Sequence, residues 1–129
     1  MKQSVLIFLT AVLLTACQET MDERCMREAK EYTEKNCPAL VTEGVTIDSL
    51  VFQPTTRTLI YYYTVKGIID DAEALKQHDF RSTLLKELKN STSMKTYKEY
   101  GYNFRYVYYS TKRKGDIVFD TTFKKKDYR

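Results

Sequence analysis

Four stretches of the chain are rich in β-branched and aromatic residues, with apolar and polar positions alternating, as is typical of strands. They cover residues 45–52, 57–65, 102–110 and 116–123. Three other stretches have the character of helices: 22–35, the leucine-containing segment after Asp70-Asp71, and about 94–100. This order predicts an α+β fold: a four-stranded, largely antiparallel sheet of two hairpins, with an N-terminal helix and two helices between the hairpins on one face.

Local signals mark where these elements begin and end. The first helix should end near Asn36, because the proline of Cys37-Pro38 biases the residue before it away from helical geometry. Asp70-Asp71 lies where the N-cap of the second helix belongs, and Gly101 is a candidate C-cap for the third. Residues 53–56 and 111–115 are predicted to be the turns of the two hairpins.

Alternation along the strands predicts which side chains face the core. In the last strand the apolar side chains Ile117, Phe119 and Phe123 share one face, opposite Val118 and three polar residues. The corresponding core positions of the two preceding strands are Leu59, Tyr61, Tyr63, Val65, Tyr102, Phe104, Tyr106 and Tyr108. The other face carries Phe52, Ile60, Tyr62, Val107 and Tyr109, beside Arg105 and Asp48.

That second face is not polar enough to be an ordinary solvent-exposed surface. One interpretation is cross-strand packing on a half-covered face. The other is a binding surface for a protein, a glycan or another component of the cell envelope. The candidate binding residues are Phe52, Tyr62, Arg105, Val107 and Tyr109.

The N-terminus has the pattern of an export signal. Lys2 precedes the apolar run from Val5 to Leu14, which is shorter than the roughly 20 residues needed to span a bilayer. The sequence Leu14-Thr15-Ala16-Cys17 that follows resembles the lipobox of bacterial lipoproteins. The resemblance implies removal of residues 1–16 and acylation of Cys17, with residues 17–24 as a lipidated tether and 25–129 as a single domain. The alternative is an ordinary cleaved signal followed by an incidental cysteine.

The lipobox also implies a location. Gln18, rather than aspartate, follows the cysteine, which in lipoproteins of enterobacterial type favours the outer membrane. The expected location is therefore the outer membrane, with the domain lipid-anchored and facing the periplasm. Two or three acyl chains give stable anchoring where one chain is marginal.

The other two cysteines, Cys25 and Cys37, form an even pair in an oxidising compartment. If the first helix runs on to Cys37, the two residues are about 18 Å apart along it. A disulfide requires Cα atoms within about 7 Å. The spacing thus favours unpaired thiols, although an unwound first turn would leave a disulfide possible.

The mature chain also resembles small uncharacterised bacterial envelope proteins. The elements that carry this resemblance are Cys37-Pro38 after a first helix, Thr46-Ile47-Asp48-Ser49, the strand from Thr58 to Thr64, and Gly101 followed by Tyr106 and Tyr108. Such proteins often carry a later cysteine that can pair with the one before proline, and this chain has none. The resemblance implies a fold rather than an activity.

Composition narrows the function classes. The 129 residues include one histidine, His78, which excludes multi-histidine metal sites and most Ser-His or Cys-His catalysts. Asp70, Asp71 and Glu73 are better explained by helix capping than by cation binding. The basic runs 112–114 and 124–126 are either solvated charge or contacts to anionic lipid headgroups; nucleic acid is not an expected partner of an exported protein.

We therefore expect no enzyme, no cofactor and no metal. The sequence predicts a non-enzymatic envelope lipoprotein that acts as a binding or adaptor module for an unknown envelope protein or glycan. The alternative is an inhibitor or immunity-type protein that blocks a lytic enzyme with a loop. Its candidate loops are the turns at 53–57 and 111–115.

Overall fold

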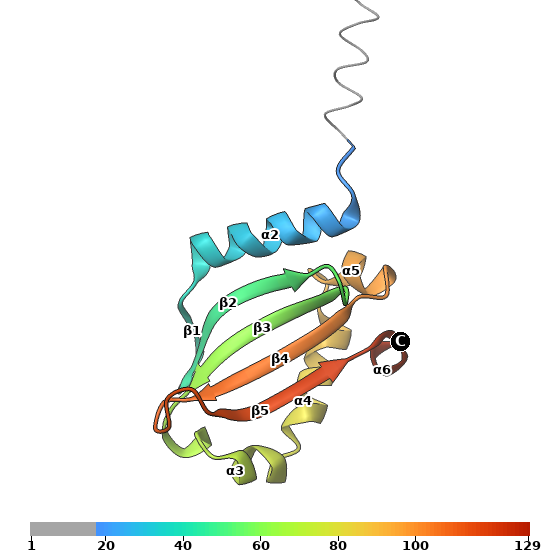
Figure 1. Ribbon diagram of the computed structural model, residues 1–129. Helices are drawn as coiled ribbons and strands as arrows, with labels where there is room; N and C mark the ends of the chain where they lie inside the picture. The colour runs from blue at the N-terminus through green and yellow to red at the C-terminus, as the bar shows by residue number, and fades with distance from the viewer. Residues whose placement is uncertain (1–17) are drawn as a thin grey trace, which may run out of the picture.

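The computed structural model describes residues 18–129, which fold around a five-stranded sheet (Figure 1). The strands are β1 (Ala39–Thr42), β2 (Val45–Gln53), β3 (Thr58–Val65), β4 (Asn103–Ser110) and β5 (Ile117–Phe123). The helices are α2 (Met21–Asn36), the 3₁₀-helix η1 (Gly67–Ile69), α3 (Ala72–Gln77), α4 (Phe80–Asn90), α5 (Lys95–Glu99) and α6 (Lys125–Tyr128). The predicted α+β class is confirmed. Within residues 18–129, none of these helices has the length and apolar character to cross a membrane.

The strand order in the sheet follows the chain, β1-β2-β3-β4-β5. Both predicted hairpins are present, and they are joined by a parallel pairing of β3 with β4; the other neighbouring strands pair antiparallel. A parallel pairing needs a long crossover, which η1, α3, α4 and α5 supply between β3 and β4. The prediction of four strands is wrong, because β1 adds a fifth at the edge. This strand of 4 residues is too short to show an alternating pattern.

Two irregularities in strand pairing correct the predicted faces. The register shifts between Ile47 and Ser49, so that Asp48 and Ser49 both lie on the outer side and Phe52 turns into the core, where only 4% of it is exposed. A shift in the β4–β5 pairing likewise leaves Ile117 49% exposed and buries Val118. The predicted positions of Phe52, Ile117 and Val118 are therefore wrong, because an inserted residue reverses the alternation.

The core lies between one face of the sheet and the helices. In Figure 1, α4 passes behind the sheet, α3 lies below its β5 edge and α5 lies beyond the start of β4; no helix is drawn in front of the sheet. Helix α4 contributes Leu84 and Leu88, which are one turn apart and share a face. They pack against a sheet face rich in aromatic side chains, of which Tyr102, Phe104 and Phe123 are completely buried. The predicted core positions of β3 and β4 are confirmed.

Helix α2 covers the edge of β2 beyond the short strand β1. Its N-cap, Thr20, accepts a hydrogen bond from the backbone N–H of Glu23, and the helix ends at Asn36 as predicted. The Thr33 hydroxyl lies within hydrogen-bonding distance of both the N–H and the carbonyl of Leu50, at 2.9 Å each. The helix thereby satisfies backbone groups that the sheet edge would otherwise leave unpaired.

The two ends of the chain differ from the predicted boundaries. Helix α2 begins at Met21, so residues 18–20 alone separate it from Cys17, instead of a tether that reaches residue 24. The C-terminal helix α6 was not predicted. It is held by the Tyr128 hydroxyl, which donates to the Tyr102 carbonyl at 2.9 Å.

Candidate functional site

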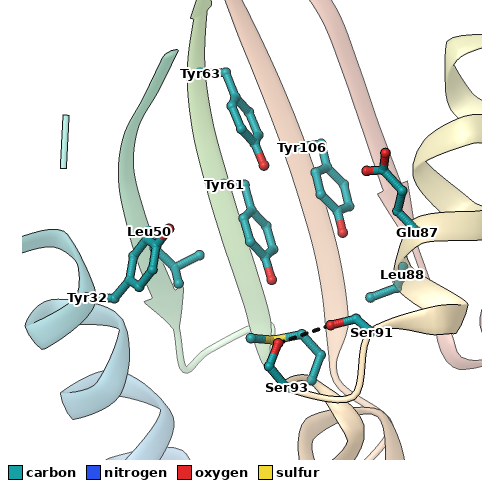
Figure 2. A pocket seen from close by; sticks show the side chains of 10 residues that line it. Tyr32, Leu50, Tyr61, Tyr63, Glu87, Leu88, Ser91, Ser93 and Tyr106 are labelled. Carbon is teal, nitrogen blue, oxygen red and sulfur yellow. Dashed lines mark hydrogen bonds between the residues drawn. The ribbon is translucent and has the colours of Figure 1, made fainter. Parts of the chain in front are cut away.

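The helices do not close over the whole core face of the sheet. A pocket of about 290 Å³ opens between α2 and α4, and Figure 2 shows it with the tyrosines of β3 and β4 as its floor. Tyr32 stands on the α2 side, and Glu87 and Leu88 stand on the α4 side. We call this pocket the tyrosine groove. Its lining residues are Tyr32, Leu50, Tyr61, Tyr63, Glu87, Leu88, Ser91, Ser93, Met94 and Tyr106.

The floor tyrosines form a stack of nearly parallel rings. Tyr61 and Tyr106 are 4.7 Å apart between ring centroids, with planes tilted by 7°. Tyr63 and Tyr108 are 4.4 Å apart at 6°. Such a stack arises because side chains at paired positions of neighbouring strands project side by side from one face of the sheet. The rings support one another, and the phenol groups extend into the groove.

These phenols stay neutral at physiological pH. Burial raises the pKa of Tyr61, and also that of Tyr63 and Tyr106, above the usual value for tyrosine. The carboxylate of Glu87 adds to the increase for Tyr63 and Tyr106 by disfavouring a second negative charge nearby. A neutral phenol both donates and accepts hydrogen bonds. The floor is therefore suited to hydrogen bonding rather than to nucleophilic attack.

Polar side chains also line the groove near the end of α4. Ser91 and Ser93 lie after the end of α4, and their hydroxyls are 3.1 Å apart, as the dashed line in Figure 2 marks. Glu87 is the single charged residue among the described residues that line the groove. The groove can therefore hold a ligand that offers hydrogen-bonding groups, and its one charge favours a neutral or positively charged group over an anion.

Sequence reasoning did not find this site. Tyr61, Tyr63 and Tyr106 were correctly placed on the core face, but the alternation gave no sign that α2 and α4 would leave them partly uncovered. Whether a core position is sealed depends on where the helices lie. A high tyrosine content on that face is the single available signal, because a tyrosine has a hydroxyl that needs a hydrogen-bonding partner or water.

Of the residues predicted to form a binding surface on the outer face, all lie on that face except Phe52, which is in the core. Tyr62 and Tyr109 are half-buried and stack with centroids 6.3 Å apart. Arg105 forms a two-pronged ion pair with Asp120, with N–O distances of 2.9 and 2.6 Å. Val107 is only 1% exposed beneath these side chains, so a partner would contact its neighbours rather than Val107 itself.

The two turns proposed as inhibitory loops lie at opposite ends of the molecule. Residues 53–57 precede β3 and residues 111–115 follow β4, and these strands run parallel (Figure 1). A single enzyme cleft therefore cannot receive both turns. An inhibitory role would rest on one of them.

The remaining candidate residues have structural surroundings. Asp71 caps α3 by accepting a hydrogen bond from the Glu73 backbone N–H at 3.0 Å, as the capping interpretation predicted. His78 is exposed at the end of α3. In residues 18–129 no cluster of histidine, cysteine, aspartate or glutamate side chains could hold a metal ion.

Cys25 and Cys37 are both free thiols, which agrees with the spacing argument. Burial raises the pKa of Cys25 to about 12, so its thiol is unreactive at neutral pH. The lipobox cysteine, Cys17, lies outside the residues that the structure describes.

Comparison with known proteins places the chain in a family. The model of a domain of unknown function (DUF8479) matches residues 20–119. The chain belongs to this family. A crystal structure of a candidate secreted protein from Pseudomonas aeruginosa has the same fold, with a TM-score of 0.70 and 17% sequence identity. The match covers 86% of this chain and 99% of that one. No curated protein matches the chain.

Proposed function

We propose that this protein is a non-enzymatic binding module, anchored by lipid to the outer membrane and facing the periplasm. The observation that carries the binding role is the tyrosine groove, a pocket of about 290 Å³ on the face of the sheet that the helices otherwise cover. A fold built only for stability would have phenylalanine in place of Tyr61 and Tyr106, because a buried hydroxyl without a partner costs about 1–3 kcal/mol.

The proposed location rests on the sequence. The apolar run from Val5 to Leu14 and the lipobox ending at Cys17 are typical of an exported lipoprotein. The Pseudomonas protein of the same fold is described as a candidate secreted protein, which is in keeping with export. Residues 18–20 then hold the domain close to the anchor.

The chemistry of the groove supports binding rather than catalysis. Its phenols keep their protons, since burial raises the pKa of Tyr61, Tyr63 and Tyr106. Glu87 is exposed, so water competes for any proton that it would transfer. Hydrogen-bonding groups that stay in one protonation state recognise a ligand without reacting with it.

The ligand that fits best is neutral or positively charged and rich in hydrogen-bonding groups. The pocket volume of about 290 Å³ corresponds to a small moiety, such as one sugar ring or one to two residues of a peptide. Envelope glycans and periplasmic proteins both offer such groups. The adaptor role predicted from the sequence follows if that moiety belongs to a larger envelope component.

The experiment compares two variants that each lose two phenol hydroxyls and no ring. Tyr61→Phe with Tyr106→Phe removes them from the groove, and Tyr62→Phe with Tyr109→Phe removes them from the outer face. Full-length protein is cross-linked in native membranes and purified, and the co-purified proteins and glycans are quantified by mass spectrometry. We expect at least one component to fall about tenfold or more in the groove variant, as two lost hydrogen bonds of about 1 kcal/mol each imply.

The matched pair separates the two surfaces. The same component should remain at the parental level in the Tyr62/Tyr109 variant. A loss confined to that variant would transfer the binding role to the outer face. Equal capture by both variants and the parent would contradict a binding role for either set of hydroxyls.

The outer face is the second candidate, and a specific observation favours it. Val51 and Ile117 are 44% and 49% exposed on strands that flank the Tyr62–Tyr109 stack. Exposed apolar side chains around stacked tyrosines resemble the composition of protein–protein contact surfaces. This face suits a protein partner better than a small ligand, because no pocket is required for it.

A further inference from the structure

The end of the domain at which the chain leaves its anchor is built from four segments that are far apart in the sequence. They are residues 18–22, the turn at 53–57, residues 95–101 and residues 124–129, and we call this surface the tether end. Arg57 joins its own turn to two other segments, with its Nε 3.9 Å from Asp22 Oδ1 and a guanidinium nitrogen 3.4 Å from the Tyr100 carbonyl. Figure 1 shows α5 near the start of α2, and α6 adjoins α5 through the Tyr128 hydroxyl, which is 3.3 Å from the Lys98 carbonyl.

The tether end carries an excess of basic side chains. Its basic residues are Arg57, Lys95, Lys98, Lys124, Lys125, Lys126 and Arg129. Its carboxylates are Glu19, Asp22, Glu99 and Asp127. The charge of one of these carboxylates is already paired, since Glu19 Oε1 is 2.8 Å from Arg27 Nε. The surface that remains attracts anions.

A shallow pocket of about 310 Å³ lies within this surface between α5 and α6. Its lining residues are Lys95, Lys98, Glu99, Lys125, Tyr128 and Arg129. The Lys98 ammonium is already used, since it donates to the carbonyls of Leu88 and Lys89 at 2.8 and 3.0 Å and so caps α4. Lys95, Lys125 and Arg129 are exposed.

The other basic run has a different setting. Residues 112–114 lie in the turn between β4 and β5, at the far end of the sheet from the tether (Figure 1). Arg113 is 3.5 Å from Asp116, and the carboxylate of Asp70 accepts a hydrogen bond from the Lys112 N–H. The positive charge of residues 112–114 is therefore partly offset. These residues also lie far from the anchor.

We propose that the tether end docks on the membrane surface, with Lys95, Lys125 and Arg129 binding the phosphate of an anionic lipid headgroup. This inference rests on the lipid anchor of the proposed function. Fully extended, the chain from Cys17 to Met21 spans at most about 14 Å. An anchor that short holds the tether end against the bilayer, where each lysine or arginine adds attraction to anionic lipid. Docking would fix the orientation of the tyrosine groove relative to the membrane.

The test uses residues 18–129, which contain the hydrophobic core that the structure describes. Binding to vesicles of phosphatidylglycerol and phosphatidylcholine is measured by co-sedimentation at low salt. Lys95→Gln with Lys125→Gln and Arg129→Gln should weaken binding about fivefold per side chain, or roughly a hundredfold together. Lys112→Gln with Arg113→Gln and Lys114→Gln removes the same charge at the far end and should change binding by less than threefold. Circular dichroism establishes that each variant is folded.

Three results would overturn the docking. They are equal weakening in the two triple variants, equal binding to vesicles of phosphatidylcholine alone, and displacement from vesicles by millimolar inorganic phosphate, which would indicate a site for free phosphate instead. The anchor is tested separately by fatty-acid labelling of the full-length protein and its Cys17→Ser variant. Labelling that persists in Cys17→Ser would contradict the proposed location and leave the vesicle result unaffected.

Discussion

At the scale of single residues, Asp70 joins two distant parts of the chain. Its carboxylate accepts hydrogen bonds from the backbone N–H groups of Thr111 and Lys112, at 3.0 and 2.9 Å. Because Asp70 follows β3 and the other two residues follow β4, this contact fixes the turn at the far end of the sheet. The sequence indicated Asp70 as part of a helix cap, but Asp71 alone caps α3.

This contact predicts a specific dependence of stability on pH. Hydrogen bonds from the Ser110 hydroxyl and from the Lys112 and Thr111 N–H groups lower the pKa of Asp70 below its usual value. An aspartate with a lowered pKa stabilises the fold above its unfolded pKa, near 4, and this stability is lost as the pH falls through the folded pKa. Asp70→Asn should thus be less stable than the parent at pH 7, and the difference should shrink towards pH 2.

Urea denaturation at a series of pH values checks this prediction. The unfolding free energies of the parent and Asp70→Asn should converge as the pH falls below about 4. A difference that is the same at pH 7 and pH 2 would show that the charge of Asp70 contributes nothing and that the substitution acts through shape alone.

At the scale of elements, the Thr33 hydroxyl links α2 to the edge of β2. Thr33 accepts from the Leu50 N–H and lies within hydrogen-bonding distance of the carbonyls of Leu50 and Ala29. Leu50 belongs to the part of β2 that β1 does not reach. The helix thus replaces the missing neighbour strand at this point.

Removing that hydroxyl should destabilise the protein without changing its fold. Thr33→Val keeps the shape of the side chain but leaves the Leu50 N–H unpaired, which costs about 1–3 kcal/mol. Thr33→Ser keeps the hydroxyl and should cost less than 1 kcal/mol. The free energies of unfolding in urea measure both. Equal losses in the two variants would mean that the methyl group, and not the hydroxyl, holds α2 in place.

At the scale of the whole molecule, the sheet has one face covered by helices and one open. Tyr108 lies on the covered face with 3% of its surface exposed and stacks on Tyr63 at 4.4 Å. Tyr62 and Tyr109 lie on the open face and are half-buried. Tyr62 is next to Tyr63 in the sequence, and Tyr109 is next to Tyr108. The members of each pair lie on opposite faces of the sheet.

Truncation should separate the two faces. Tyr108→Ser removes a packed aromatic ring and should cost about 3 kcal/mol or more, enough to unfold a domain of this size in mild denaturant. Tyr62→Ser with Tyr109→Ser should cost nearer 1 kcal/mol per side chain. Thermal melts monitored by circular dichroism give the order. Unfolding of the Tyr62/Tyr109 variant before Tyr108→Ser would mean that the open face carries more of the packing than its exposure indicates.

The candidate sites were predictable to different degrees. The open face was predicted with Tyr62, Arg105 and Tyr109 in their observed positions, because alternation holds along β3 and β4. Phe52 was misplaced, since a bulge at Asp48 and Ser49 reverses the alternation after them. The tyrosine groove could not be predicted, because it exists where two helices fail to meet.

By itself the sequence determined most elements of this protein, with β1 and α6 as exceptions. The four long strands, the end of α2 at Asn36, the N-cap at Asp71 and the core side of Phe104 and Tyr106 depend on residues close together in the chain. It also determined the export pattern before residue 18.

Tertiary structure alone decided how those elements combine. The parallel pairing of β3 with β4, the pairing of β1 with β2, the reversal of Phe52 and the groove between α2 and α4 each depend on contacts between distant segments. The gathering of basic residues between α5 and α6 also depends on contacts between distant segments. Local pattern sets what a segment becomes, but the packing free energy of the whole core sets where it goes.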